Sequence, residues 1–177
     1  MRRSFRSLSC EALVIKYKNL NEADRLITIF CQEKGKILVI AKGLRKLKSS
    51  KRAYLEPGNL VKIQLIIGQS LPILTQATLI SDLSCLREKL SQIRSLLQIL
   101  EVIDKLFVEE ELELDLYQLV IATRDLLLQK QSLGQIKHNL GLIVQQLGYL
   151  PQKQGSLLDY ISQITDRPMN SFEFLKI

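Results

Sequence analysis

The spacing of the apolar residues changes near residue 81, and this change divides the chain into two kinds of structure. Before it, short apolar runs alternate with polar residues and are separated by turn sequences such as Pro57-Gly58-Asn59. Such alternation is typical of half-buried strands. After it, apolar residues recur every three or four positions, as on one face of an amphipathic helix. The pattern predicts an α+β chain, with a β domain over residues 1–80 and an all-helical domain over residues 81–177.

Five short strands are predicted in the first 80 residues. They are expected at residues 11–18, 25–32, 36–41, 60–67 and 71–78. Lys34-Gly35 and Gly68-Gln69 supply two of the turns between them. Five strands without a helical pattern favour a small closed barrel, and a five-stranded barrel of OB type is the natural candidate.

The second half of the chain predicts a series of helices. They are expected at residues 83–103, 114–129, 132–148 and 156–164, with a last piece after Pro168. Ser132 is the predicted N-cap of the third helix, and Gly148 followed by Pro151 is its predicted stop. Gly141 lies in the middle of this helix, where a missing side chain is expected to permit close contact with another helix.

Positive charge is concentrated in the predicted β half. Residues 1–80 hold 15 lysines and arginines against 5 acidic residues, whereas residues 81–177 hold 10 against 13. A half-molecule with a charge near +10 attracts polyanions at long range. The charge alone does not say which polyanion is attracted.

The strongest basic segment is residues 42–52, KGLRKLKSSKR, which we call the basic loop. It holds six cations and no carboxylate, and it lies between two predicted strands. Each cation that neutralises a phosphate releases condensed counterions, so the loop suits a nucleic acid. A solvated loop or a contact for another acidic partner is the alternative. The first 80 residues hold few aromatic residues for stacking bases, which favours binding through phosphates with the bases left free to pair.

The histidine, cysteine and acidic residues form no recognisable catalytic or metal-binding pattern. The candidates are the only histidine, His138, the acidic residues Glu22 and Asp24, the acidic run after Val108, and the cysteines Cys10, Cys31 and Cys85. No glycine-rich phosphate-binding motif is present. We therefore expect no enzyme, cofactor, bound metal or small-molecule substrate. The absence of a signal peptide and of a long apolar run predicts a cytoplasmic protein with free thiols and no membrane partner.

Several segments, in order, resemble the bacterial RecO family of DNA repair proteins. They are EADRL, EKGK and AKGLRKLKS within residues 21–50, LTQA at 74–77, LGYLP at 147–151 and ITDRPMNSFEFL at 164–175. The first of these regions is the most specific. Many members carry a four-cysteine zinc-binding insertion after the LGY-P segment, but no cysteine follows Cys85 here. The resemblance therefore predicts a full-length member without zinc.

The family resemblance also implies a function and partners. It implies an OB-fold domain and a helical domain, binding of single- and double-stranded DNA, and annealing of complementary strands. It further implies that recombinase is loaded onto strands coated by single-strand-binding protein. The implied partners are RecR, the recombinase RecA, and the acidic C-terminal tail of the single-strand-binding protein. An OB-fold RNA-binding module and an adaptor for acidic protein tails remain as alternatives.

The DNA contacts that the resemblance implies are the cations of the basic loop and Arg25 of the EADRL segment, followed by two lysines at the turn before the strand that leads into the loop. They are Arg25, Lys34, Lys36, Lys42, Arg45, Lys46, Lys48, Lys51 and Arg52. Gly43 is expected to matter for the backbone shape of the loop. A basic rim around an apolar groove for a protein partner is predicted on the first helix, at Arg87, Lys89 and Arg94.

Overall fold

The contacts within the computed structural model divide the chain into two compact units. The structure describes residues 6–46, 49, 51–129, 133–149, 156–166 and 169, with the backbone alone described at Arg87 and Glu88. One unit comprises Met1–Asp82 and the short segment Glu109–Glu111, and the other comprises Leu83–Val108 and Leu112–Ile177. The first unit contains every strand in the described chain, and the second contains its long helices.

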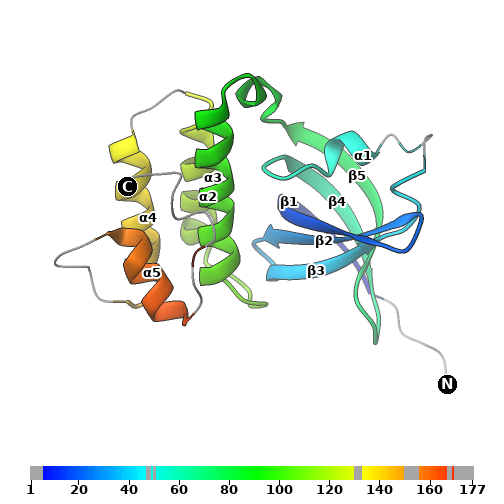
Figure 1. The fold of residues 1–177 in the computed structure, drawn as a ribbon. Helices are drawn as coiled ribbons and strands as arrows, with labels where there is room; N and C mark the ends of the chain where they lie inside the picture. The colour runs from blue at the N-terminus through cyan, green and yellow to red at the C-terminus, as the bar shows by residue number, and fades with distance from the viewer. Residues whose placement is uncertain are drawn as a thin grey trace. The chain divides into compact units, whose positions relative to one another are not determined.

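Five strands of the first unit form a closed barrel (Figure 1). They are β1 (Arg6–Leu20), β2 (Asp24–Cys31), β3 (Gly35–Ala41), β4 (Leu60–Ile67) and β5 (Ile73–Ser81). Their order around the barrel is β1-β2-β3-β5-β4, and every neighbouring pair is antiparallel except β3 with β5. This barrel followed by helices confirms the predicted fold class, an OB-type barrel with an all-helical part after it.

Strand β1 is long enough to pair with both of its neighbours. Its first half pairs with β4, beginning with Arg6 opposite Ile67, and its second half pairs with β2. The register shifts between Val14 and Lys16, and an irregularity of this kind bends a strand and increases its twist. The predicted strand over residues 11–18 is therefore too short. The other four strands begin and end within three residues of their predicted bounds.

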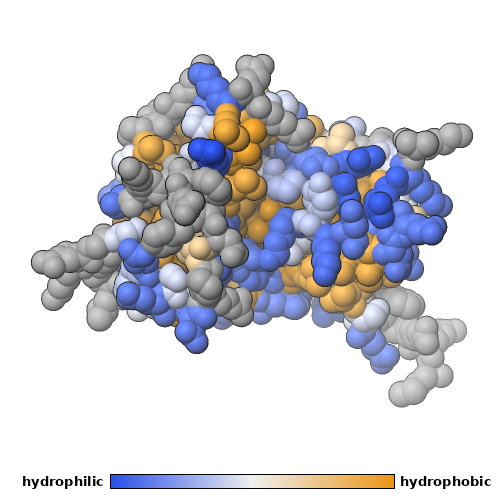
Figure 2. Space-filling model, viewed as in Figure 1, coloured by the Kyte–Doolittle hydropathy of each residue, from blue (hydrophilic) through white to orange (hydrophobic). Residues whose placement is uncertain are grey.

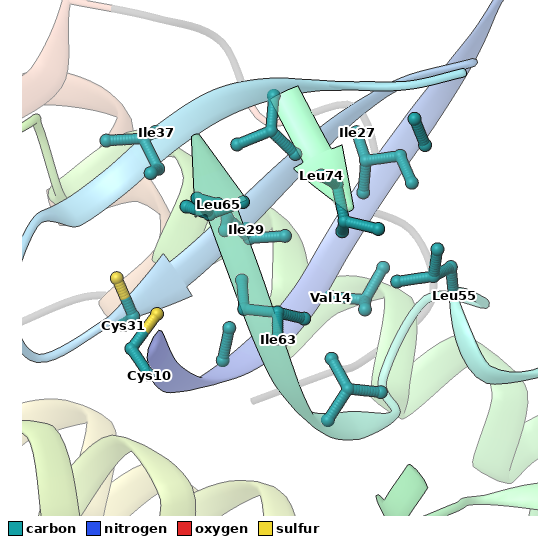
Figure 3. Close-up of a cluster of buried hydrophobic side chains, with 14 of the residues drawn as sticks. Cys10, Val14, Ile27, Ile29, Cys31, Ile37, Leu55, Ile63, Leu65 and Leu74 are labelled. Carbon is teal, nitrogen blue, oxygen red and sulfur yellow. The ribbon is translucent and has the colours of Figure 1, made fainter. Parts of the chain in front are cut away.

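Alternate residues of the strands build the barrel core. Figure 3 shows aliphatic side chains from all five strands meeting inside the barrel. On β2, for example, Ile27, Ile29 and Cys31 point inward and are fully buried. Leu44 and Leu55 lie outside the strands and belong to the same cluster, with exposures of 1% and 0%. Burying one such aliphatic side chain contributes about 1.5–3 kcal/mol, so Leu44 fixes part of the basic loop to the core.

In its described part, the second unit has one short 3-10 helix and four α-helices. They are η1 (Ser84–Glu88), α2 (Leu90–Leu106), α3 (Leu114–Asp125), α4 (Leu133–Gln146) and α5 (Leu157–Thr165). The predicted helix over residues 83–103 is wrong at its start, because Lys89 has an extended backbone between η1 and α2. Leu83 and Leu86 are buried nonetheless. A 3-10 helix has three residues per turn. Apolar residues three positions apart therefore lie on one face of it, as they do on an α-helix over one turn.

The two glycines predicted to shape the third helix behave differently. Gly148 ends α4 as predicted, since its φ is +85° and its N–H donates to the carbonyl of Gln145 at 3.0 Å. The close helix contact predicted at Gly141 is wrong. Apart from its chain neighbours and the backbone of its own helix, no atom of the described residues lies within 4 Å of the place where a Cβ atom would stand.

Some of the predicted features lie outside the described residues. They are the N-cap at Ser132, the segment 151–155 and the last helical piece after Pro168. None of the helices within the described ranges is long and apolar enough to cross a bilayer.

Candidate nucleic-acid interface

The basic loop joins the end of β3 to a short helix, α1 (Lys51–Tyr54). Its last two residues are therefore helical and not irregular. Figure 2 shows hydrophilic residues at the right-hand edge of the barrel, where the loop after β3 lies in Figure 1. The basic loop thus forms part of an exposed polar surface at one end of the β2–β3 hairpin.

Backbone hydrogen bonds fasten the first part of the loop to the turn between β1 and β2. The N–H of Gly43 donates to Oδ1 of Asp24 at 2.8 Å, and the N–H of Arg45 donates to the carbonyl of Ala23 at 2.9 Å. Gly43 has a φ of +67°, a left-handed conformation that glycine adopts without steric cost. The expectation that Gly43 shapes the loop is confirmed. With Leu44 buried between them, these contacts fix the backbone of residues 43–45 against the barrel.

Four cations of the basic loop expose their side chains to solvent. They are Lys42, Arg45, Lys46 and Arg52. Arg45 also donates from Nη1 to the carbonyl of Asn21 at 2.7 Å, which aligns its guanidinium beside the β1–β2 turn. Lys51 is half-buried, and its Nζ donates to the carbonyl of Thr75 on β5. Lys48 lies outside the described residues.

Arg25 is buried, unlike the exposed cations of the loop, although it was predicted to contact DNA. The residue is only 5% exposed. Its Nη1 lies 3.2 Å from Oε1 of Glu56, and its guanidinium lies 3.8 Å from the centre of the Tyr17 ring. A guanidinium held by a carboxylate and an aromatic ring has little room for a phosphate. We therefore remove Arg25 from the contact set and assign it a structural role.

Lys34 and Lys36 lie at the opposite end of the β2–β3 hairpin from the basic loop. The hairpin runs from the pair Arg25–Ala41, beside the loop, to the pair Cys31–Gly35, at the turn. Six residues of strand separate these pairs by about 20 Å. Acidic residues also meet this turn, since Gly35 bridges Glu109 and the N–H of Glu110 donates to the carbonyl of Lys34. The structure therefore does not bring these two lysines together with the loop cations.

Comparison with known proteins identifies the family of the barrel. Residues 3–83 match the family described as "Recombination protein O N terminal". This part of the chain is therefore similar to the N-terminal part of RecO proteins. The RecO match covers the barrel strands, the basic loop and the β1–β2 turn to which the loop is fastened.

Curated proteins named "DNA repair protein RecO" align with a longer part of the chain. The protein from Syntrophomonas wolfei is 32% identical over 58% of this chain, and that from Salinibacter ruber is 34% identical over 63%. The protein from Bifidobacterium longum subsp. infantis is 34% identical over 71% of this chain. These alignments cover 41%, 44% and 53% of the three relatives. The chain thus spans about half the length of these RecO proteins.

Two exposed lysines near the loop escaped the sequence-based set of contacts. Lys16 and Lys18 lie on the second half of β1, opposite Thr28 and Leu26 of β2. This part of β1 leads directly into the β1–β2 turn, to which the basic loop is hydrogen-bonded. Their alternation within a strand was a usable signal, because residues two apart share one face of a sheet.

The predicted partner site on the first helix is described in part. Lys89 and Arg94 are exposed, and the side chain of Arg87 is outside the described part of the chain. Leu90 and Leu97 are also exposed, at 62% and 47%. Cations and apolar side chains thus lie together at the N-cap and in the first two turns of α2, and their role remains a prediction.

Proposed function

We propose that this chain binds DNA through the sugar–phosphate backbone, with the basic loop as the main contact. The set consists of the exposed loop cations together with the two lysines of β1. These residues are Lys16, Lys18, Lys42, Arg45, Lys46 and Arg52. Binding of this kind neutralises phosphates and releases counterions, so it depends little on base sequence.

The observation that carries the proposal is the fastening of the loop to the barrel. A basic loop that only keeps a protein soluble needs no fixed conformation. Here Leu44 is 1% exposed within the core, and the backbone on either side of it is hydrogen-bonded to Asp24 and Ala23. Cations held in place in this way lose less conformational entropy when they bind.

The similarity to RecO proteins supports a finer proposal. We propose that the protein acts in recombinational DNA repair by binding, without catalysis, and anneals complementary single strands in the cytoplasm. Tyr17 is the one aromatic residue of the described barrel that is both near the loop and more than a third exposed. Since Arg25 covers its ring, phosphate contacts would dominate and the bases would remain free to pair.

The proposed partners are those implied by the family. We propose that the protein binds single- and double-stranded DNA, RecR and the acidic tail of the single-strand-binding protein, and that it assists RecA indirectly. Lys89 and Arg94, beside the exposed Leu90 and Leu97, are suited to an acidic tail that also carries apolar residues.

A pair of double variants tests the loop in a DNA-binding and annealing experiment. Arg45→Ala with Lys46→Ala removes two exposed loop cations, whereas Lys34→Ala with Lys36→Ala removes the same charge about 20 Å away. We expect the loop variant to bind a single-stranded oligonucleotide roughly tenfold more weakly at low salt. It should also anneal two complementary strands more slowly, and the hairpin-turn variant should do both almost as the wild type does.

Equal losses in the two double variants would show that net charge, and not the loop, determines binding. Unchanged binding in the loop variant would refute the assignment. An RNA oligonucleotide of the same sequence serves as a competitor in the same experiment. If RNA displaces DNA at lower concentration than DNA displaces itself, the protein is an RNA-binding module instead.

A further inference from the structure

Two buried cysteines and a carboxylate meet at the end of the barrel that is remote from the basic loop. The Sγ atoms of Cys10 and Cys31 and a carboxylate oxygen of Glu33 all lie within 4.8 Å of one another. Figure 3 shows the two sulfur atoms beside each other. The cysteines are 21 residues apart in the chain, so their spacing did not suggest a shared site. They meet because neighbouring strands bring them together.

The strand register favours a bridging ion over a direct bond between the two sulfur atoms. Cys31 pairs with Ala12 on β1, whereas Cys10 pairs with Ile63 on β4. Cys10 and Cys31 are therefore diagonal neighbours, whose Cα atoms are typically about 7–8 Å apart. A disulfide usually requires a Cα separation below about 6.8 Å. A tetrahedral zinc ion with Zn–S bonds of about 2.3 Å holds two sulfur atoms about 3.8 Å apart, which small side-chain movements can provide.

The geometry around Cys31 suits a metal ligand, because its sulfur atom accepts hydrogen bonds from the Cys10 thiol and from the backbone N–H groups of Lys34 and Glu33. Glu33 is exposed, so its carboxylate connects the buried sulfur atoms to solvent and offers an ion a path of entry.

We propose that Cys10, Cys31 and Glu33 bind one divalent ion with an affinity for thiolates, of the class of Zn²⁺ and Cd²⁺. Two sulfur atoms and one carboxylate oxygen supply three ligands, and a water molecule completes a tetrahedral site. Both thiols give up their protons to solvent, so each ion that binds releases about two protons. The ion links β1 to the turn after β2. This site is separate from the DNA-binding proposal, and either can fail without the other.

The test is a titration of the full chain, freed of metal by a chelator and kept reduced, with Cd²⁺ alone. We expect one Cd²⁺ per chain, ultraviolet absorption from cadmium–thiolate bonds, release of about two protons per ion, and a higher melting temperature. Zn²⁺ added afterwards should displace Cd²⁺ and remove the absorption.

Three variants assign the ligands, and one serves as the matched control. Cys85→Ser removes the exposed cysteine of the second unit and should bind Cd²⁺ as the wild type does. Cys10→Ser and Cys31→Ser should lose most of the absorption. Serine at either buried cysteine can destabilise the barrel core and so lower Cd²⁺ binding indirectly. Glu33→Gln changes an exposed position and provides the independent test. This variant should bind Cd²⁺ at least about tenfold more weakly than the wild type.

The proposal is overturned if the wild type binds no Cd²⁺, or if binding depends on Cys85. It is also overturned if Glu33→Gln binds as tightly as the wild type. A further outcome also overturns it: the reduced chain takes up no Cd²⁺, and oxidised glutathione produces a Cys10–Cys31 disulfide. The two cysteines would then form a redox pair and not a metal site.

Discussion

At the scale of single residues, side chains that carry the same positive charge have different roles, which depend on the groups that they contact. Arg45 is exposed and hydrogen-bonded to the β1–β2 turn, whereas Arg25 is buried against Glu56 and Tyr17. The sequence placed both arginines among the DNA contacts. It could not separate them, because the carboxylate that engages Arg25 lies 31 residues further along the chain.

Replacing Arg25 should therefore affect stability more than DNA binding. We expect Arg25→Ala to lower the free energy of unfolding by about 3 kcal/mol, because it leaves the half-buried Glu56 without its ion-pair partner and empties space beside Tyr17. The measurement is urea denaturation, with Arg45→Ala as the control that should change stability by less than about 0.5 kcal/mol. A stable Arg25→Ala protein with weakened DNA binding would return Arg25 to the contact set.

At the scale of whole elements, hydrophobic spacing predicted the type and order of the strands and helices well. It predicted the residues at which they begin and end less well. Strand β4 begins and ends as predicted, because turn residues flank a clear alternation. The length of β1 was missed, since its first half is defined by pairing with β4 and not by its own pattern. The break at Lys89 was missed because apolar residues recur every three or four positions through both η1 and α2, although Leu90 and Leu97 of this series are exposed.

Two glycines, one within α4 and one just after it, should change stability in opposite directions when each is replaced by alanine. Gly141→Ala should raise the free energy of unfolding by about 0.5–1 kcal/mol, because alanine favours a helix and its Cβ would enter open space. Gly148→Ala should lower it by about 1 kcal/mol, since its φ of +85° strains any residue with a Cβ atom. Thermal or urea unfolding measures both. A destabilised Gly141→Ala protein would indicate a helix contact that the described residues do not contain.

At the scale of the whole molecule, the sequence located the basic surface but not its extent. The charge count and the family resemblance both pointed to residues 42–52, and the structure fastens that loop to the barrel. Lys34 and Lys36 were also predicted as contacts because they are close to the loop in the sequence. They lie at the other end of the β2–β3 hairpin. The structure adds Lys16 and Lys18 instead, and it reveals the Cys10–Cys31 pair that strand pairing alone creates.

The measurement that tests the central claim most directly is the salt dependence of binding to single-stranded DNA. If the six cations of the proposed contact set each neutralise one phosphate, the logarithm of the association constant should fall against the logarithm of salt concentration with a slope of about −4. Arg45→Ala with Lys46→Ala should reduce the magnitude of the slope by about 1.4. A wild-type slope near zero, or the same slope in both proteins, would contradict binding of phosphates by the basic loop.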